Sequence, residues 1–269
     1  MNDTYIVTGF VVIDDLLTVM NHQDDGRTGV SASEIMIVAV VAAKYFQKHH
    51  GRALLVLQRL GYIPKLSLSR FNRRWHNLLA TLWQLAELLG DLLAQGTVFI
   101  IDSMPLPVCK WVRAPRCKKV QGRAFHGYCA SKAARYFGGQ LHLVCDARGV
   151  PVTFQMLPAR WDELVPVQEL LAGLPPGSQV VADKGYVSYQ DEILAYFHGH
   201  VRLIPKYRKN MRSNSQADAL LIREHRSLIE TVNSQLEKMG LQRLYARTNE
   251  GFALKVLASL VALALTNVN

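Results

Sequence analysis

The sequence is poor in cysteine and has no cysteine pair at the spacing of a metal site. Its four cysteines, Cys109, Cys117, Cys129 and Cys145, have 7, 11 and 15 residues between neighbours. Neither a C-x-x-C zinc motif nor a disulfide framework follows from that spacing. We therefore expect reduced thiols in a cytoplasmic protein.

The sequence also lacks the marks of a secreted or membrane protein. No basic residue precedes the apolar stretch at the N-terminus, and Asp14 and Asp15 interrupt that stretch early, so no signal peptide is expected. The apolar run 252–265 contains Lys255 and is too short for a bilayer span. It predicts a core helix and no membrane partner.

Acidic residues are scarce relative to basic ones. The chain has 31 lysines and arginines against 21 acids, a net charge of +10. Residues 101–140 contain eight basic groups and a single acid, Asp102, and residues 201–269 contain eleven basic groups and five acids. This distribution predicts an acidic partner such as nucleic acid, with the positive charge concentrated in these two segments.

Residues 1–96 have the pattern of an all-α domain. Ser31 and Glu34 have capping-box spacing before the apolar run 35–41, and a second helix is expected from about residue 67 past Leu93. Three arginines lie near its start, at Arg70, Arg73 and Arg74. One interpretation is a domain that binds DNA ends, and a plain helical bundle with a solvated basic face is equally open.

From Thr97 onward the pattern becomes that of an α/β domain, over residues 97–269. The apolar run 97–101 predicts a first strand, and Asp146 to Gly149 predicts the turn of a hairpin between strands 139–145 and 150–156. Helices over about 162–171 and 189–197 alternate with strands 180–182 and 201–204. This order predicts a mixed sheet covered by helices on both faces.

Three acids have settings that suit a metal ligand. Asp102 ends the first strand, Asp183 ends the run 180–182, and Glu230 lies in a helix four residues after Arg226. Polar residues recur on one face of that helix at spacings of three and four: Arg223, Arg226, Glu230, Asn233 and Glu237. Such a seam suits the wall of an active site and equally a solvent face, and either aspartate could simply cap a turn.

The residue types themselves indicate a particular chemistry. A carboxylate at the end of a buried strand is costly unless it meets a cation or hydrogen-bond donors. Carboxylate oxygens are ligands that Mg²⁺ prefers. Two divalent ions held by carboxylates can activate a nucleophile and stabilise the leaving oxygen of a phosphodiester. The pattern therefore predicts a site for a pair of divalent cations such as Mg²⁺.

Three stretches resemble the DDE transposases of bacterial insertion sequences: 101–109 (IDSMPLPVC), 182–186 (ADKGY) and 226–231 (RSLIET). The resemblance is to insertion-sequence family nine-eighty-two, in the superfamily of families four and five. It implies a ribonuclease-H-like catalytic domain in which Asp102, Asp183 and Glu230 are the catalytic metal ligands. It also implies two ions of Mg²⁺ or Mn²⁺ as cofactors. The reaction implied is hydrolysis at the element ends, then strand transfer by the freed 3′-hydroxyl.

The same resemblance implies double-stranded DNA as partner, both as terminal inverted repeats and as target. A dimer or larger assembly follows from the need to pair two ends. A nuclease of the same fold without strand transfer, and a decayed or domesticated copy that only binds DNA, are the alternatives. The cell compartment implied is the bacterial cytoplasm, at the nucleoid.

The sequence departs from the family pattern at two positions. Where relatives often carry a basic residue seven positions after the glutamate, this chain has Glu237, which leaves Lys238 as the substitute. Trp161 stands where histidine is common and could stack on an unpaired base or pack. Asp146 and Asp162 are reserve acids, although Asp146 suits a turn.

Basic side chains near the three acids are the expected phosphate contacts. With the arginines of the helical domain, the expected DNA-binding residues are Lys110, Arg113, Arg116, Lys118, Lys119, Arg123, Lys206, Arg208, Lys209, Arg226 and Lys238.

Overall fold

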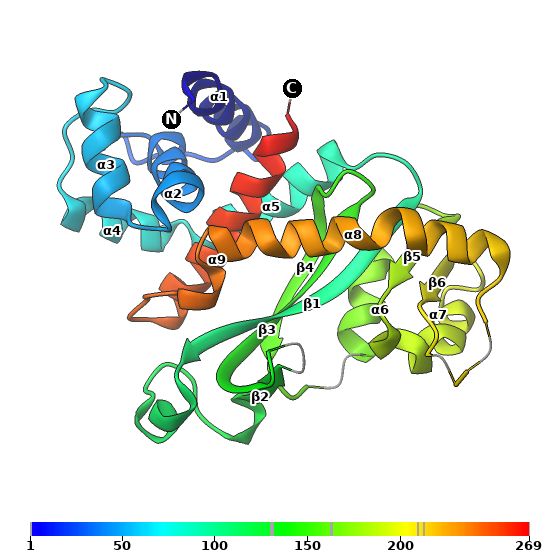
Figure 1. The fold of residues 1–269 in the computed structure, drawn as a ribbon. Coiled ribbons are helices and arrows are strands. Elements are labelled where there is room, and N and C mark those ends of the chain that lie inside the picture. The colour runs from blue at the N-terminus through cyan, green and yellow to red at the C-terminus, as the bar shows by residue number, and fades with distance from the viewer. Residues whose placement is uncertain (1, 130–131, 162–163, 209, 212, 269) are drawn as a thin grey trace. The chain divides into compact units, whose positions relative to one another are not determined.

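The computed structural model describes residues 2–129, 132–161, 164–208, 210–211 and 213–268 (Figure 1). Its contacts divide the chain into two compact units. The helical unit consists of Met1–Leu93 and Gln235–Asn269, and the sheet unit is Ala94–Ser234. The expected boundary after residue 96 lies close to the end of the first segment, whereas the last 35 residues cluster with the N-terminal helices.

The helical unit is built around two buried helices, and all its N-terminal elements are helical. Its helices are α1 (Asp3–Val19), α2 (Ala32–Phe46), α3 (His50–Arg59), α4 (Leu68–Asn77), α5 (Leu79–Leu93) and α9 (Asn249–Ala264). The expected capping box begins α2, where the Glu34 side chain accepts from the Ser31 N–H at 2.6 Å. Helix α2 is buried from Ala32 to Ala43 and packs against α9.

The C-terminal segment is held inside this unit by burial and by a lysine. Nearly all residues of α9 from Leu254 to Ala264 are buried, which confirms the expected core helix. The segment Asn249–Asn267 is long and apolar enough to cross a membrane by composition alone, with 67% of it buried. Buried Lys48 donates to the Met239 carbonyl at 2.6 Å, and burial, then the charge of Lys255, lowers the pKa of Lys48 to about 7.

The expected single helix from residue 67 past Leu93 is two helices, α4 and α5, separated at Leu78. Phe71 and Trp75 are buried on α4, and Leu82 and Leu85 are buried on α5. Because the apolar spacing continues across the break, the sequence pattern contains no sign of it.

The sheet unit contains one mixed six-stranded sheet. Its strands are β1 (Val98–Cys109), β2 (His126–Cys129), β3 (Ala134–Asp146), β4 (Pro151–Pro158), β5 (Ser178–Ala182) and β6 (Val201–Pro205). Its helices are α6 (Leu164–Ala172), α7 (Gln190–Tyr196) and α8 (Gln216–Lys238), and the last four residues of α8 belong to the helical unit. The path is β2-β3-β1-β5-β6, and β4 pairs with β3. Strands β1, β5 and β6 are parallel, whereas β3 is antiparallel to β1, β2 and β4. The expected hairpin is the β3–β4 turn, with Gly149 at φ +86°.

Alternation along the strands gives the sheet two different faces. Phe99 and Ile101 of β1 belong to a buried cluster with Leu170 and Leu171 of α6 and Ile193 of α7. The intervening residues of β1 therefore face the other side. Helix α8 covers that side, since residues of α8 line a cavity together with Ile100 and Asp102. The mixed sheet with helices on both faces confirms the expected α/β class, and the order is compatible with a ribonuclease-H-like fold.

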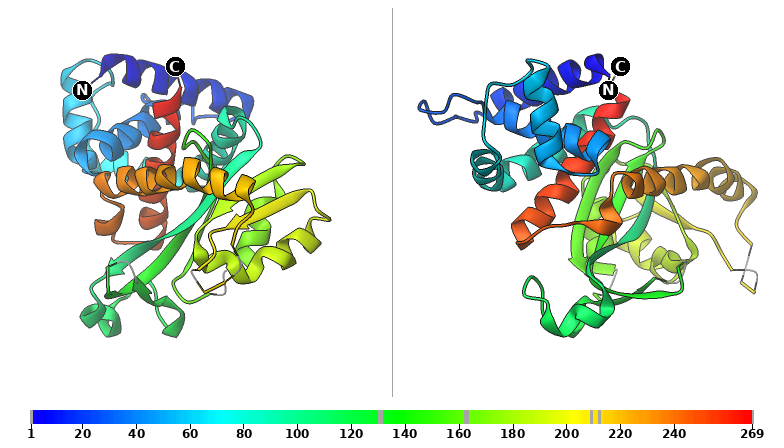
Figure 2. Two further views of the ribbon diagram at one scale, coloured as in Figure 1. Left: turned by 45° about the vertical axis from the view of Figure 1, so that its right-hand side comes forward. Right: turned by 60° about the vertical axis from the view of Figure 1, so that its left-hand side comes forward.

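Strand β1 is longer than the expected 97–102. It continues through two prolines and pairs with β3 as far as Cys109. Beyond Asp102 it has β3 on one side only, because its pairing with β5 ends at Ile101. A proline is tolerated in a strand that has a free edge. Figure 2 shows β1 and β3 extending together beyond β5 and β6, with the segment 110–125 at their far end.

Candidate active site

Two of the three expected acids lie where the parallel pairing of β1 with β5 ends. Ile101 of β1 is paired in register with Ala182 of β5. Asp102 follows Ile101 and Asp183 follows Ala182, so the two aspartates lie next to each other just beyond the last pair of the β1–β5 ladder. The Lys206 N–H follows β6 at the same place and donates to the Ala182 carbonyl at 3.1 Å. This end of the sheet therefore brings two carboxylates and a lysine together.

Asp102 is the most buried of the three carboxyl groups. Burial raises the pKa of Asp102 to about 6, hydrogen bonds from the Ser103 backbone and Asn233 oppose the shift, and the nearby charges of Asp183 and Glu230 add to it. The Asn233 Nδ2 atom donates to Asp102 Oδ2 at 2.7 Å. This bond fixes α8 to β1 one helical turn beyond Glu230.

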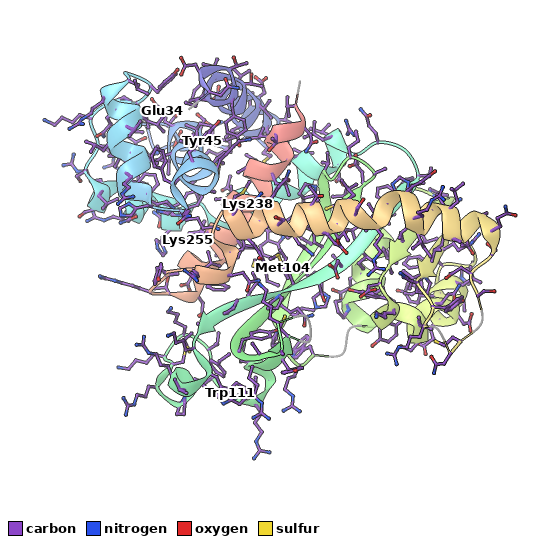
Figure 3. All side chains as sticks on the ribbon, viewed as in Figure 1. Glu34, Tyr45, Met104, Trp111, Lys238 and Lys255 are labelled. Carbon is purple, nitrogen blue, oxygen red and sulfur yellow. The ribbon has the colours of Figure 1, made fainter. Side chains whose placement is uncertain are left out.

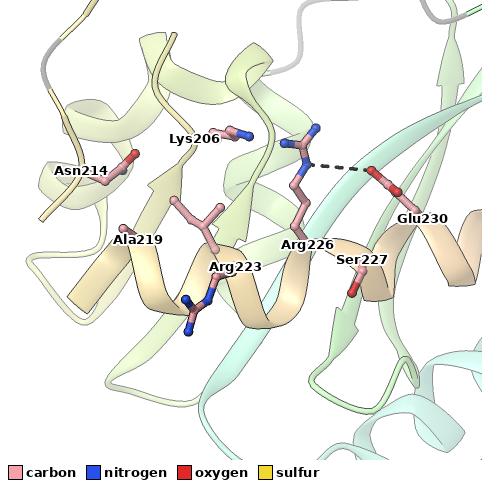
Figure 4. Close-up of a pocket in the computed structure, with 8 residues that line it drawn as sticks. Lys206, Asn214, Ala219, Arg223, Arg226, Ser227 and Glu230 are labelled. Atoms are coloured by element: carbon pink, nitrogen blue, oxygen red, sulfur yellow. Dashed lines mark ion pairs between the residues drawn. The ribbon is translucent and has the colours of Figure 1, made fainter. Parts of the chain in front are cut away.

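Glu230 lies on α8 at the mouth of the site (Figure 4). Its side chain is 71% exposed, and its Oε1 atom lies 3.9 Å from Nε of Arg226. An exposed pair at that distance contributes little to stability. Since the pair is weak, Glu230 is free to turn toward another partner.

One cavity joins all three carboxyl groups. It has a volume of about 80 Å³, and its lining includes Asp102, Asp183 and Glu230 together with Ile222 and Ile229 of α8. At roughly 10–15 Å³ of such volume per water molecule, the cavity has room for several waters. Lys206 and Arg226 also line it, which gives the cavity an acidic centre with a basic border.

The carboxylates do not form a ready-made metal cluster. Among the residues that the structure describes, no three histidine, cysteine, aspartate or glutamate side chains are close enough to hold an ion together. The Glu230 side chain is exposed and lies 3.9 Å from Arg226. The donor set nevertheless fits a hard cation, because carboxylate oxygens are the ligands that Mg²⁺ prefers. Burial first, and then the charges of Asp183 and Glu230, raise the pKa of Asp102, and a bound cation would offset both effects.

A second, wider hollow adjoins the first along α8. Its volume is about 450 Å³, and Glu230, Lys206 and Arg226 line both (Figure 4). Arg223, Ser227 and Asn214 complete its polar lining. Three cationic side chains around one hollow suit the phosphates of a polyanion.

The comparison with known families agrees with this geometry. The family model described as "Transposase DDE domain" matches residues 93–244, more than half of the chain. The chain belongs to the DDE transposase family. Among the curated proteins and the solved structures, no match was found.

The first expected DNA-binding segment of this transposase lies at the far end of β1 and β3. Its exposed basic residues are Lys110, Arg113, Arg116, Lys118 and Arg123, with Lys119 half-buried. Figure 3 marks Trp111 in this segment. Arg135 lies over the Trp111 ring at 5.6 Å, and the ring contacts His126 edge-on. The segment is thus an exposed basic surface fixed by aromatic packing.

The remaining expected DNA contacts of the transposase differ in exposure. Arg208, Lys238, Arg70 and Arg73 are exposed, whereas Lys209 lies outside the described residues. Arg74 is engaged within the helical unit, where it pairs with Asp24 at 2.9 Å and donates to the Val30 carbonyl. Its position indicates that Arg74 holds the loop before α2.

Of the two reserve acids, the structure describes only Asp146, which has a structural role in a turn. Asp146 is fully buried and accepts from the backbone N–H groups of Gln95, Arg148 and Val150. It is therefore a structural residue of the β3–β4 turn. Asp162 lies outside the described residues, and its neighbour Trp161 is 56% exposed.

Asn233 is the site residue to which sequence reasoning assigned no role. It appears in the sequence only as one member of the polar face of the helix. Its hydrogen bond reaches across 131 residues of chain. The helical register alone places Asn233 beside Glu230, but no local pattern names Asp102 as its partner.

Proposed function

We propose that this chain is an insertion-sequence transposase that hydrolyses a phosphodiester at the element end and joins the freed 3′-hydroxyl to target DNA. The observation that carries the proposal is the shared cavity of Asp102, Asp183 and Glu230 at the end of parallel strands. The basic hollow beside it supports a DNA substrate. The mixed sheet, with parallel β1, β5 and β6 beside the antiparallel β3, supports a ribonuclease-H-like catalytic domain.

Asp102, Asp183 and Glu230 are the residues that would hold two ions of Mg²⁺ or Mn²⁺. Bound there, the ions would supply activation of the attacking oxygen and stabilisation of the leaving one. Lys206 and Arg226 would bind the phosphates flanking the scissile bond. Buried Ile222 and Ile229, which line the cavity from α8, would limit the access of bulk water to Asp102.

The three acids and the motifs around them also support a finer assignment of the family and of the two domains. The motifs around Asp102, Asp183 and Glu230 support membership of insertion-sequence family nine-eighty-two. Residues 1–96 would bind the element ends and 97–269 would carry out catalysis. Terminal inverted repeats and target DNA would be the partners, in a dimer or larger complex at the nucleoid.

A strand-transfer assay tests this function against a nuclease of the same fold. The substrate is DNA that brackets the reading frame, offered intact and with a pre-cleaved 3′ end. The proposal predicts metal-dependent nicking of the first and joined products from the second. Nicking without joined products would identify a nuclease, and DNA binding without nicking would identify a copy that only binds.

Asn233→Leu is expected to reduce cleavage by about 10–100-fold, because a residue that orients a metal ligand has effects of that size. The substitution removes the donor to Asp102 while keeping a similar volume. The measurement is the Mg²⁺ concentration for half-maximal cleavage, which should rise. Ser234→Leu, at the next and exposed position of α8, is the control. An unchanged Mg²⁺ requirement in Asn233→Leu would remove the positioning role.

Arg113→Ala combined with Lys118→Ala is expected to weaken DNA binding and flatten its salt dependence. Each lost phosphate contact lowers the slope of log K against log salt by about 0.9, so the double variant should lose about 2. Fluorescence anisotropy over a salt series measures this slope. Arg27→Ala with Arg59→Ala removes equal charge from exposed positions elsewhere. Equal slopes in both double variants would argue against phosphate contacts from this segment.

A further inference from the structure

The helical unit contains a cavity of its own, of about 380 Å³. Helices α3 and α4, the segment before α9 and the first turns of α9 line it, with no acidic residue in the lining. The polar and aromatic members are His50, Asn72, Trp75, His76, Tyr245, Arg247, Thr248 and Lys255. A cavity of this volume is in the range of small-molecule sites.

The positive side chains of this cavity are set around the beginning of a long helix. Thr248 caps α9, whose Gly251 N–H donates to Thr248 Oγ1 at 3.0 Å. A Cβ on Gly251 would lie 3.1 Å from Cε1 of His76, so the first turn of α9 lies directly against the His76 ring. Exposed Arg247 precedes the cap. Together the helix N-terminus and the arginine favour an anion such as a phosphate.

The floor of the cavity has polar groups suited to a ligand. Trp75 is 1% exposed, and its indole N–H has no hydrogen-bond partner among the described residues. The His50 ring lies edge-on to Trp75, with ring centroids 5.9 Å apart. Burial, then the charge of Lys255, lowers the pKa of His50 to about 4. At neutral pH His50 therefore has one donor and one acceptor nitrogen.

An exposed aromatic ring lies at the rim. Tyr245 is 86% exposed, the largest value among the large hydrophobic residues that the structure describes as exposed. Its carbonyl accepts from Lys255 Nζ at 2.5 Å, which ties the Tyr245 backbone to α9; Figure 3 marks Lys255 in this region. A ring presented to solvent beside an arginine is the arrangement on which unpaired bases stack.

We propose that this cavity binds a nucleotide of single-stranded DNA. Arg247 and the first turn of α9 bind its phosphate, and Tyr245 stacks on its base. The bases of a duplex already stack on one another, so the ligand is an unpaired strand. This site is distinct from the carboxylate cavity. The choice of DNA as its ligand rests on the proposed function, in which the protein acts on DNA.

Fluorescence anisotropy with the full chain in EDTA tests the site. The probes are a twelve-residue oligothymidylate and a blunt duplex, with thymidine monophosphate as competitor. We expect Arg247→Ala and Tyr245→Ala each to weaken oligothymidylate binding by about tenfold, the scale of a lost stacking contact, and duplex binding by less than about twofold. Tyr245→Phe keeps the ring and should bind as wild type. Arg243→Ala, an exposed arginine of the same segment outside the cavity, is the charge-matched control.

Three results would overturn the proposal. Equal losses in Arg243→Ala and Arg247→Ala would indicate general charge, equal losses on duplex would indicate a duplex surface, and displacement by the monophosphate at equal nucleotide concentration would indicate a free nucleotide. Failure of the proposed function gives a different pattern. A wild-type chain that binds oligothymidylate through Tyr245 but does not cleave DNA keeps this site and loses the transposase activity.

Discussion

Asp102→Asn should lower metal-dependent DNA cleavage by about 10³-fold or more, on the scale of removing one member of a catalytic unit, and leave DNA binding unchanged. The loss is expected because Asp102 is the central carboxylate of the shared cavity and is hydrogen-bonded to α8. Asparagine has nearly the same shape but is a poorer ligand for a hard cation. The measurement is the nicking rate on element-end DNA, with anisotropy for binding.

The same substitution should stabilise the fold when no metal is added. Because burial first, and then the neighbouring carboxylates, raise the pKa of Asp102 to about 6, the native state is less stable with this group ionised. At pH 7.5 the variant should gain on the order of 1–3 kcal/mol in free energy of unfolding. The gain should disappear near pH 4, where Asp102 is largely protonated in the native state. Urea unfolding at both pH values measures it.

Asp191→Asn is the matched control for both effects, since Asp191 is an exposed aspartate at the start of α7. It should change neither cleavage nor stability. Full cleavage by Asp102→Asn would remove Asp102 from the site. A destabilised Asp102→Asn protein would contradict the electrostatic reasoning even if cleavage were lost.

Glu230→Gln should likewise lower the cleavage rate by about 10³-fold, whereas Glu237→Gln should leave the cleavage rate unchanged. Both glutamates are exposed on α8, and only Glu230 lines the cavity of Asp102 and Asp183. The comparison therefore separates a role in the site from a general loss of negative charge on the helix. Nicking rates at saturating Mg²⁺ provide the measurement.

Glu230 is the most informative of the three acids to substitute. In the sequence, the assignment of Glu230 to the site rests on helical register and on its spacing from Arg226. In the structure, its side chain is turned toward that arginine. Activity retained in Glu230→Gln would leave two carboxylates and require another ligand. Asp183→Asn, at the end of β5, should match Asp102→Asn in cleavage.

Local patterns in the sequence were sufficient to predict the secondary-structure elements that carry the three acids. The apolar runs before Asp102 and Asp183 predict two strands that end in carboxylates, and their parallel pairing is what places these residues side by side. The turn at Gly149 and the cap at Ser31 follow from equally local chemistry. In each case the residues that make the structure are neighbours in the chain.

Long-range packing could not be predicted in the same way. The apolar pattern of α9 predicts a core helix but not that it packs against α2, about two hundred residues earlier. The extension of β1 through Pro105 and Pro107 depends on β3 pairing along only one of its edges. The bond from Asn233 to Asp102 and the pair of Arg74 with Asp24 are similarly contacts between distant segments.

Diffraction from the protein bound to element-end DNA and Mn²⁺ tests the central claim most directly. The claim is that carboxylates from β1, β5 and α8 converge on divalent ions. We expect anomalous peaks from Mn²⁺ ions coordinated by Asp102 and Asp183, with the Glu230 side chain turned from Arg226 toward the ions. Mn²⁺ bound elsewhere, in crystals whose protein cleaves the same DNA, would contradict it.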